Sequence, residues 1–226
     1  MNQENAGMTK GASLVLCAMM LAGTLCAASC NIVGPAYLLA KGPPKADAQY
    51  ELPPERPVMV FVDDRLPVLG RRELRQMMAA AAQKGILDNK VSTNVIDYRA
   101  GVALADRETP GQPTDLVTLA QTAQCELIVY ATVDAFSLSP DRQNMLPTAR
   151  LRVKVLDATK DSPRVWPADA EGFPLLVQPM QRATPLPDKP SDELRAENAF
   201  AEQVGAAIAK LFYSHEIRES VGVDKK

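Results

Sequence analysis

The stretch TARLRVKVLD, residues 148–157, alternates cleanly between basic and aliphatic side chains. Successive side chains of an extended strand point to opposite faces, so this pattern predicts a strand with one face in solvent and one against a core. The predicted inner face carries Leu151, Val153 and Val155. The predicted outer face carries Arg150, Arg152 and Lys154. Such a half-buried strand is typical of an antiparallel sheet.

Upstream of this strand, apolar runs alternate with amphipathic segments. The runs PVMVFV (57–62) and CELIVYATVDAF (125–136) predict buried strands, and a short strand is expected over 93–98. Leu74, Met77, Met78 and Ala81 recur at helical spacing, with Arg71, Arg72 and Arg75 on the other side and Gly85 where a C-terminal cap belongs. Leu116, Leu119, Ala120 and Ala123 predict a second helix, which Thr114 would cap. Residues 99–112 are ambiguous, with a further helical turn as one possibility.

Downstream, two more strands and a long helix are expected. Residues 163–166 and 172–178 have strand composition, and Pro167 and Pro174 favour an edge or a bulge there. The final helix would be capped by Ser191 and end near Tyr213. Its apolar stripe consists of Phe200, Val204, Ala207, Ile208 and Leu211. The order β-α-β-α-β-β-β-α predicts an α+β fold, a mixed sheet with helices packed on it.

The first 29 residues have the character of a targeting segment. Residues 12–28 carry no charge, and Lys10 is the basic residue that precedes them. A core helix is disfavoured because the run is apolar all round, and a retained transmembrane helix because it is marginally short. A signal peptide fits best: a short basic start, an apolar centre and small residues at its end. Met8 is an alternative start to Met1.

Ala27, Ala28 and Ser29 precede Cys30, and this order resembles the lipobox of bacterial lipoproteins. Leucine is commoner where Ala27 stands. The resemblance implies cleavage before Cys30, which then carries the lipid (palmitate among its acyl chains) and anchors the chain to a membrane. Simple secretion and a retained anchor are the alternatives. The residue after the cysteine is Asn31 rather than aspartate, which in such proteins of diderm bacteria implies sorting to the outer membrane, facing the periplasm.

These features predict four regions along the 226-residue chain. A signal peptide over 1–29 precedes a lipidated, proline-rich tether over 30–56. One α+β domain is expected over 57–214, followed by a flexible tail over 215–226.

Composition disfavours catalysis and nucleic-acid binding. The net charge is −2, with 25 basic and 27 acidic side chains, so no polyanion-binding surface is indicated. His215 is the single histidine, and Cys125 is the one cysteine outside the first 30 residues. Asp63 and Asp64 could bind a metal, but no further ligands can be named, and a solvated loop is favoured. We expect no enzyme activity, no cofactor and no metal site.

Two stretches carry a family resemblance: LAQTAQCELIVYATVDAF (119–136) and TARLRVKVLDATKDSPRVWPADAEGF (148–173), together with the closing helix. They resemble the periplasmic lipoproteins of the curli-assembly and penicillin-binding-protein-activator group, which is related to the amino-terminal domain of TolB. Ala131 departs from the usual glycine, and Ser162-Pro163 from the usual glycine-containing turn. The resemblance implies binding or assembly rather than catalysis.

The expected function is therefore that of a lipid-anchored interaction domain, acting in assembly or regulation of a cell-envelope complex. The alternative is a carrier of a small apolar ligand or an accessory lipoprotein of a transport system. We expect the charged part of a partner surface to be the stripe Arg150, Arg152 and Lys154. The alternative is that these side chains belong to an ordinary solvated sheet face. A large apolar cavity would favour the carrier, and a solid core with an exposed patch would favour the interaction domain.

Overall fold

The computed structural model describes residues 45–63, 68–107, 114–179 and 184–217. Its main compact unit runs from Ala46 to His215. The predicted signal peptide, Cys30 and most of the predicted tether lie outside the described residues. The compact unit starts before the expected domain boundary at Pro57, because Leu52 is buried in the core and the backbone N–H of Gln49 donates to the carbonyl of Leu211.

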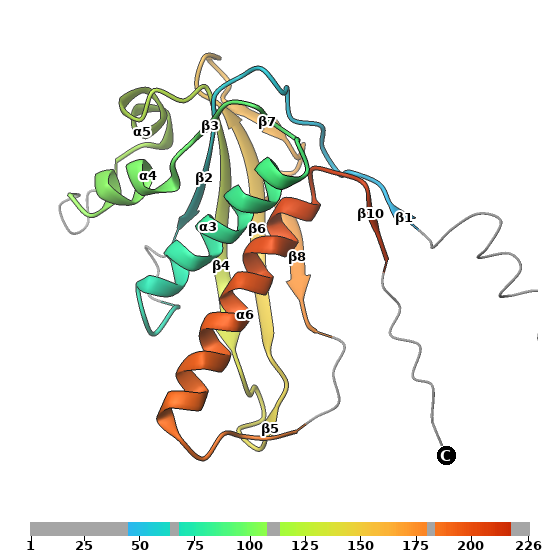
Figure 1. Ribbon diagram of the computed structural model, residues 1–226. Helices are drawn as coiled ribbons and strands as arrows, with labels where there is room; N and C mark the ends of the chain where they lie inside the picture. Colours follow the sequence, from blue (N-terminus) through green and yellow to red (C-terminus); the bar gives the residue numbers. More distant parts are fainter. Residues whose placement is uncertain (1–44, 64–67, 108–113, 180–183, 218–226) are drawn as a thin grey trace, which may run out of the picture. The chain divides into compact units, whose positions relative to one another are not determined.

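A mixed sheet forms the centre of this unit (Figure 1). Its strands are β2 (Val58–Asp63), β3 (Val95–Ile96), β4 (Leu127–Ser137), β6 (Thr148–Asp157), β7 (Arg164–Trp166) and β8 (Phe173–Val177). The order is β3-β2-β4-β6-β7, and β8 also pairs with β6. Strand β2 is parallel to β3 and β4, whereas β6 is antiparallel to β4, β7 and β8. Two short pairs, β1 (Lys45–Ala46) with β10 (His215–Glu216) and β5 (Asn144–Met145) with β9 (Thr184–Pro185), lie outside the central sheet.

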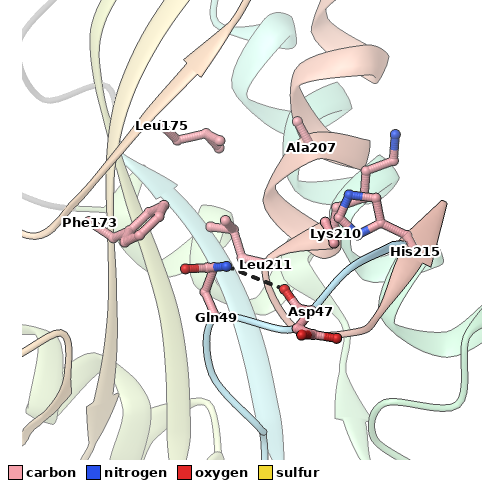
Figure 2. Close-up of a pocket in the computed structure, with 9 residues that line it drawn as sticks. Asp47, Gln49, Phe173, Leu175, Ala207, Lys210, Leu211 and His215 are labelled. Atoms are coloured by element: carbon pink, nitrogen blue, oxygen red, sulfur yellow. Dashed lines mark hydrogen bonds between the residues drawn. The ribbon is translucent and has the colours of Figure 1, made fainter. Parts of the chain in front are cut away.

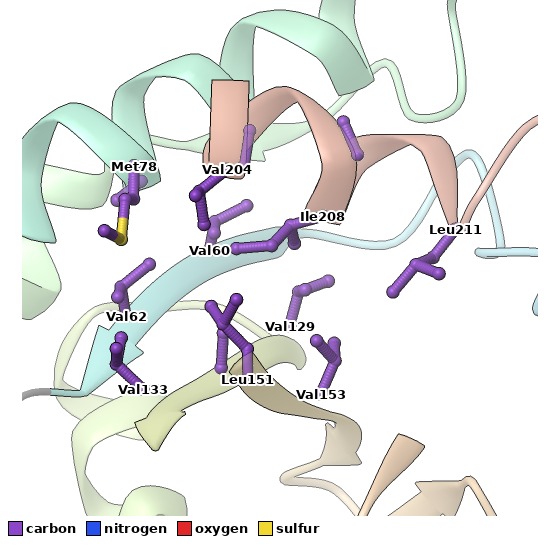
Figure 3. Close-up of a cluster of buried hydrophobic side chains, with 14 of the residues drawn as sticks. Val60, Val62, Met78, Val129, Val133, Leu151, Val153, Val204, Ile208 and Leu211 are labelled. Atoms are coloured by element: carbon purple, nitrogen blue, oxygen red, sulfur yellow. The ribbon is translucent and has the colours of Figure 1, made fainter. Parts of the chain in front are cut away.

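Helices cover the two faces of the sheet unequally. Helices α3 (Glu73–Asp88) and α6 (Pro190–Lys210) pack on one face and build the main core with alternate residues of β2, β4 and β6. Figure 3 shows Met78 of α3 and Val204 and Ile208 of α6 above the strands. Helices α4 (Tyr98–Ala105) and α5 (Leu116–Thr122) cover Met59 and Phe61 on the opposite face. The predicted mixed α+β fold is confirmed.

Several local predictions hold and others need correction. Strand β6 has the predicted bounds, with Leu151, Val153 and Val155 in the core. Gly85 is not a cap: α3 continues to Asp88, and Gly85 lies where α6 approaches. Arg75 was expected in solvent, but it is 9% exposed and pairs with Asp106.

The caps of two helices also differ from expectation. Asp115 rather than Thr114 caps α5, and its carboxylate accepts hydrogen bonds from the N–H groups of Val117 and Thr118. Helix α6 begins at Pro190, with Lys189 rather than Ser191 at the cap position, because a proline suits the first turn, where no N–H partner is needed.

A buried ion pair ties together the ends of three strands. The guanidinium of Arg56, just before β2, donates to both carboxylate oxygens of Asp157 at 2.8 Å. It also bonds Glu126, just before β4, at 2.6 Å. Asp157 ends β6, is 1% exposed, and accepts further hydrogen bonds from the N–H and hydroxyl of Thr159. The hydrogen bonds from Arg56 hold the pKa of Asp157 well below its usual range, so the carboxylate stays charged although it is buried.

Candidate interaction surface

The outer face of the sheet is solvent-exposed where α4 and α5 do not reach. Here β4, β6 and β8 present Thr132, Asp134, Arg150, Arg152, Lys154 and Leu176, all half-buried or exposed. The three predicted cations lie on this one face because β6 alternates regularly along its length. We call this region the outer face.

The three cations of the outer face are not equivalent. Arg152 donates to both carboxylate oxygens of Asp134 at 2.7–3.1 Å and to Glu171 at 2.7 Å. The hydrogen bonds to Asp134 raise the pKa of Arg152 above its ordinary value. A register shift between Val133 and Ala135 accompanies the placement of Asp134 beside Arg152. Arg152 is therefore engaged within the domain, and its charge is balanced.

Arg150 and Lys154 differ from Arg152 in their ion pairing. Within the part of the chain that the structure describes, neither forms an ion pair. Arg150 lies opposite Leu176 in the β6–β8 register, and Leu176 is 61% exposed. The outer face therefore has a cation beside an exposed apolar side chain.

A groove of about 300 Å³ opens beside β8 and the C-terminal half of α6 (Figure 2). Phe173 and Leu175 of β8 form its apolar part together with Ala207 and Leu211. Lys210, His215, Asp47 and Gln49 form its polar rim, where the Gln49 side chain donates to the carbonyl of Asp47 at 3.3 Å. The groove is open to solvent and lies at the edge of the sheet, rather than being enclosed between sheet and helices.

Of the two candidate metal ligands, the structure describes Asp63. Asp63 is 5% exposed and accepts a hydrogen bond of 2.5 Å from the hydroxyl of Tyr130, whereas Asp64 lies outside the described residues. No group of three or more His, Cys, Asp or Glu side chains that could hold a metal occurs among the described residues. The Nδ1 atom of His215 lies 3.2 Å from the carbonyl of Tyr213, and His215 lines the groove.

Cys125 and Trp166 have structural environments. Burial raises the pKa of the Cys125 thiol to about 11, so the thiolate that nucleophilic chemistry requires is scarce at neutral pH. Trp166 stacks on Phe173 with ring centroids 5.1 Å apart, and it also contacts Tyr50 and Phe212. These contacts make Trp166 part of the packing beside the main core.

Two parts of the candidate site were not predicted from the sequence. The groove requires α6 to cross the end of the sheet beside β8, which no local pattern encodes. A signal for it is present in FPLLV (173–177), where Pro174 favours an edge strand and the remaining side chains are apolar. The balancing of Arg152 depends on Asp134 and Glu171, which come from β4 and the β7–β8 turn.

Comparisons with known proteins give only distant likenesses. No family model matches the chain, and no curated protein matches it. A PelC dodecamer structure from Paraburkholderia phytofirmans matches with a TM-score of 0.39 and 9% identity, covering 74% of this chain and 95% of that one. The hypothetical protein CT253 from Chlamydia trachomatis matches with a TM-score of 0.36 and 14% identity, covering 68% of this chain and 98% of that one. These likenesses are too distant to carry a functional argument.

Among the described residues, no helix is both long enough and apolar enough to cross a membrane.

Proposed function

We propose that this protein is a lipid-anchored interaction domain of the cell envelope, attached to a membrane through Cys30 and acting in the assembly or regulation of an envelope complex. The outer face is the observation that carries the proposal. Its cations Arg150 and Lys154, which form no ion pair with any other described residue, flank the balanced Arg152, and the exposed Leu176 lies beside Arg150. The periplasmic side of an outer membrane is the proposed location, and no cofactor or nucleic acid is part of the proposal.

The groove gives less support to a carrier of a small apolar ligand. Small-molecule sites are usually concave pockets of about 300–1,000 Å³ that bury most of the ligand surface. The groove has a volume of about 300 Å³, at the lower end of that range, and it is open. The main core is instead filled by side chains of both layers, such as Val129, Leu151 and Ile208 (Figure 3). An interaction role is therefore better supported than carriage of a ligand.

Reversing the charges of Arg150 and Lys154 tests the proposed surface. The double variant Arg150→Glu/Lys154→Glu is expected to reduce recovery of envelope partners in a cross-linked pull-down, because opposite charges across an interface guide association. Its thermal stability should change little, since exposed single charges add little to folding. Arg152 is left intact, because a glutamate there would face Asp134 and Glu171.

The matched control is Arg72→Glu/Lys90→Glu, which makes the same change in net charge at two exposed positions at the ends of α3. This control should leave partner recovery unchanged. If both double variants recover less partner protein to the same extent, the change in net charge alone is responsible. If neither variant recovers less, the outer face is not the partner surface.

The anchoring part of the proposal predicts a specific biochemical result. Cys30→Ser should abolish incorporation of labelled palmitate and release the chain from the membrane fraction or block its processing, since the thiol is the acceptor. Cys26→Ser, in the same apolar run, should keep the label because Leu25 precedes it rather than a small residue. Label retained by Cys30→Ser, or a mature N-terminus other than Cys30, would refute the assignment.

A further inference from the structure

Strand β8 is an edge strand with an uncharged sequence. It pairs with β6 on one side, and no other described strand pairs with it. Natural edge strands are usually protected by charged side chains or by proline; FPLLV (173–177) carries no charge, and Pro174 is the protecting residue within it. Both faces of β8 are apolar, with Phe173 and Leu175 towards the groove and Leu176 on the outer face. The absence of charge leaves the outward N–H and C=O groups of this edge strand available for pairing with another strand.

The backbone of β8 can accept another strand. Proline lacks an N–H group and occurs in sheets where the N–H side faces away from the neighbouring strand, so Pro174 indicates which residues face outward. In an antiparallel pair, the N–H and C=O groups of alternate residues point to the same side. The N–H and C=O of Leu176 therefore face away from β6, together with the C=O of Pro174.

The groove supplies space for the inward side chains of such a strand. Phe173 and Leu175 lie on the β8 side of the groove, and Ala207 and Leu211 on the α6 side (Figure 2). A strand added to β8 would extend the sheet by about 4.8 Å, and alternate side chains would point under α6. The apolar lining requires these side chains to be apolar.

The charges that flank this edge define the remaining chemistry of the occupant. Lys210 lies on the groove side, and Arg150 is the β6 partner of Leu176 on the outer face. Neither cation forms an ion pair within the described ranges. A segment with acidic side chains near Lys210 and Arg150 would complement both cations, whereas Asp47 on the groove rim would repel an acidic side chain placed beside it.

We propose that the β8 edge and its groove bind an extended segment of a partner protein, apolar on its inward side and acidic at one or more other positions, as an added strand. This mode takes its affinity from main-chain hydrogen bonds and its specificity from alternate side chains. It rests on the proposed interaction role and assigns to it a second contact, next to the outer face.

The test is direct binding to the full-length protein in detergent micelles. The probe is a fluorescent peptide of alternating valine and threonine with one central glutamate, followed by fluorescence anisotropy. Saturable binding is expected, and N-methylation of alternate amides should weaken it about tenfold because hydrogen bonds to the edge are lost. A basic version, with lysine for the glutamate, should also bind more weakly.

Two matched pairs of variants locate the site. Leu176→Pro removes the outward N–H, whereas Leu176→Ala removes the side chain but keeps that N–H, so the proline variant should bind the peptide several-fold more weakly than the alanine variant. If Leu176→Pro fails to fold, the second pair decides. Ala207→Gln fills the groove from α6, and Ala206→Gln makes the same change at a neighbouring half-buried position that does not line the groove. Only Ala207→Gln should weaken binding.

The results separate this inference from the proposed function. Absence of saturable binding, or equal binding by Ala207→Gln and Ala206→Gln, would overturn the edge site while leaving the Cys30 and outer-face experiments to stand on their own. Light scattering that shows a dimer of the wild-type protein, lost in Leu176→Pro, would assign the edge to a second copy and also overturn the proposal.

Discussion

Replacement of Arg56 with alanine is expected to destabilise the folded protein by about 3 kcal/mol, because the buried carboxylate of Asp157 loses the guanidinium that donates to both of its oxygens. Asp157 is 1% exposed, and without Arg56 its carboxylate would keep two hydrogen bonds from Thr159 and the exposed Lys160, whose Nζ atom lies 3.5 Å away. The expected loss lies at the lower end of values for buried pairs, since the Arg56 side chain is 27% exposed. Chemical denaturation of the full chain measures it.

The two partners of this ion pair should not be equally costly to remove. Asp157→Asn keeps the shape and an oxygen acceptor, and the partly exposed Arg56 retains Glu126 as its partner. This variant should therefore lose less stability than Arg56→Ala. The control is Glu126→Gln, which alters the 44% exposed partner and should cost less than about 1 kcal/mol. Equal losses in Arg56→Ala and Glu126→Gln would contradict the assigned role of the buried carboxylate.

The same ion pair makes stability depend on pH in a defined direction. The pKa of Asp157 is lowered in the folded state, chiefly by its hydrogen bonds from Arg56, whereas an aspartate in an unfolded chain has a pKa of about 3.9. The pair therefore contributes fully above about pH 5, and its contribution is lost as the pH falls through the unfolded-state value towards the lower folded-state value. Stability of Asp157→Asn, measured from pH 6 to pH 2, should fall less steeply than that of the wild type.

The sequence predicts what is local in this fold. The alternation over 148–157 determines both the bounds of β6 and the faces of its side chains, because the period of two is a property of the strand itself. The apolar run of β2 is likewise sufficient to predict a buried strand, and all six of its residues are buried. The α+β class follows from the order of such elements.

What the sequence could not predict depends on contacts between distant segments. Arg152 follows the same alternating pattern as Arg150 and Lys154. Of these three cations, however, it is the charge of Arg152 that Asp134 and Glu171 balance. The groove exists only because Phe173 and Leu175 meet Ala207 and Leu211, which lie on another element. A glycine at position 85 is compatible with either a helix cap or the close approach of another helix. Only the position of α6 distinguishes the two. The side-chain amide of Asn89 bonds the Gly85 carbonyl, so α3 ends a turn later.

The close approach of α3 and α6 leads to the second large expected effect, at Gly205 in α6. A Cβ atom at this position would overlap the carbonyl oxygen of Met78 and lie 2.7 Å from the Cβ of Ala81. Backbone cannot yield as the end of a flexible side chain can, so the two helices would have to separate. Gly205→Ala should therefore destabilise the protein by about 1–3 kcal/mol or more, because separation disturbs the core beneath the helices. Helix propensity alone would make the alanine variant more stable by about 1 kcal/mol. A loss of stability therefore supports the close contact between the helices, and a gain contradicts it.

Two further variants make this prediction specific to the helix crossing. Gly70→Ala is the control, since a Cβ there meets nothing within 4 Å, and it should be neutral or slightly stabilising. At the other contact point, a Cβ on Gly85 would lie 2.6 Å from the Cβ of Ala209. Gly85→Ala should destabilise, and Ala209→Gly in that background should restore part of the lost stability, because it removes the opposing methyl group. A double-mutant cycle measures this coupling, and additive losses would show that the two helices do not cross where the structure places them.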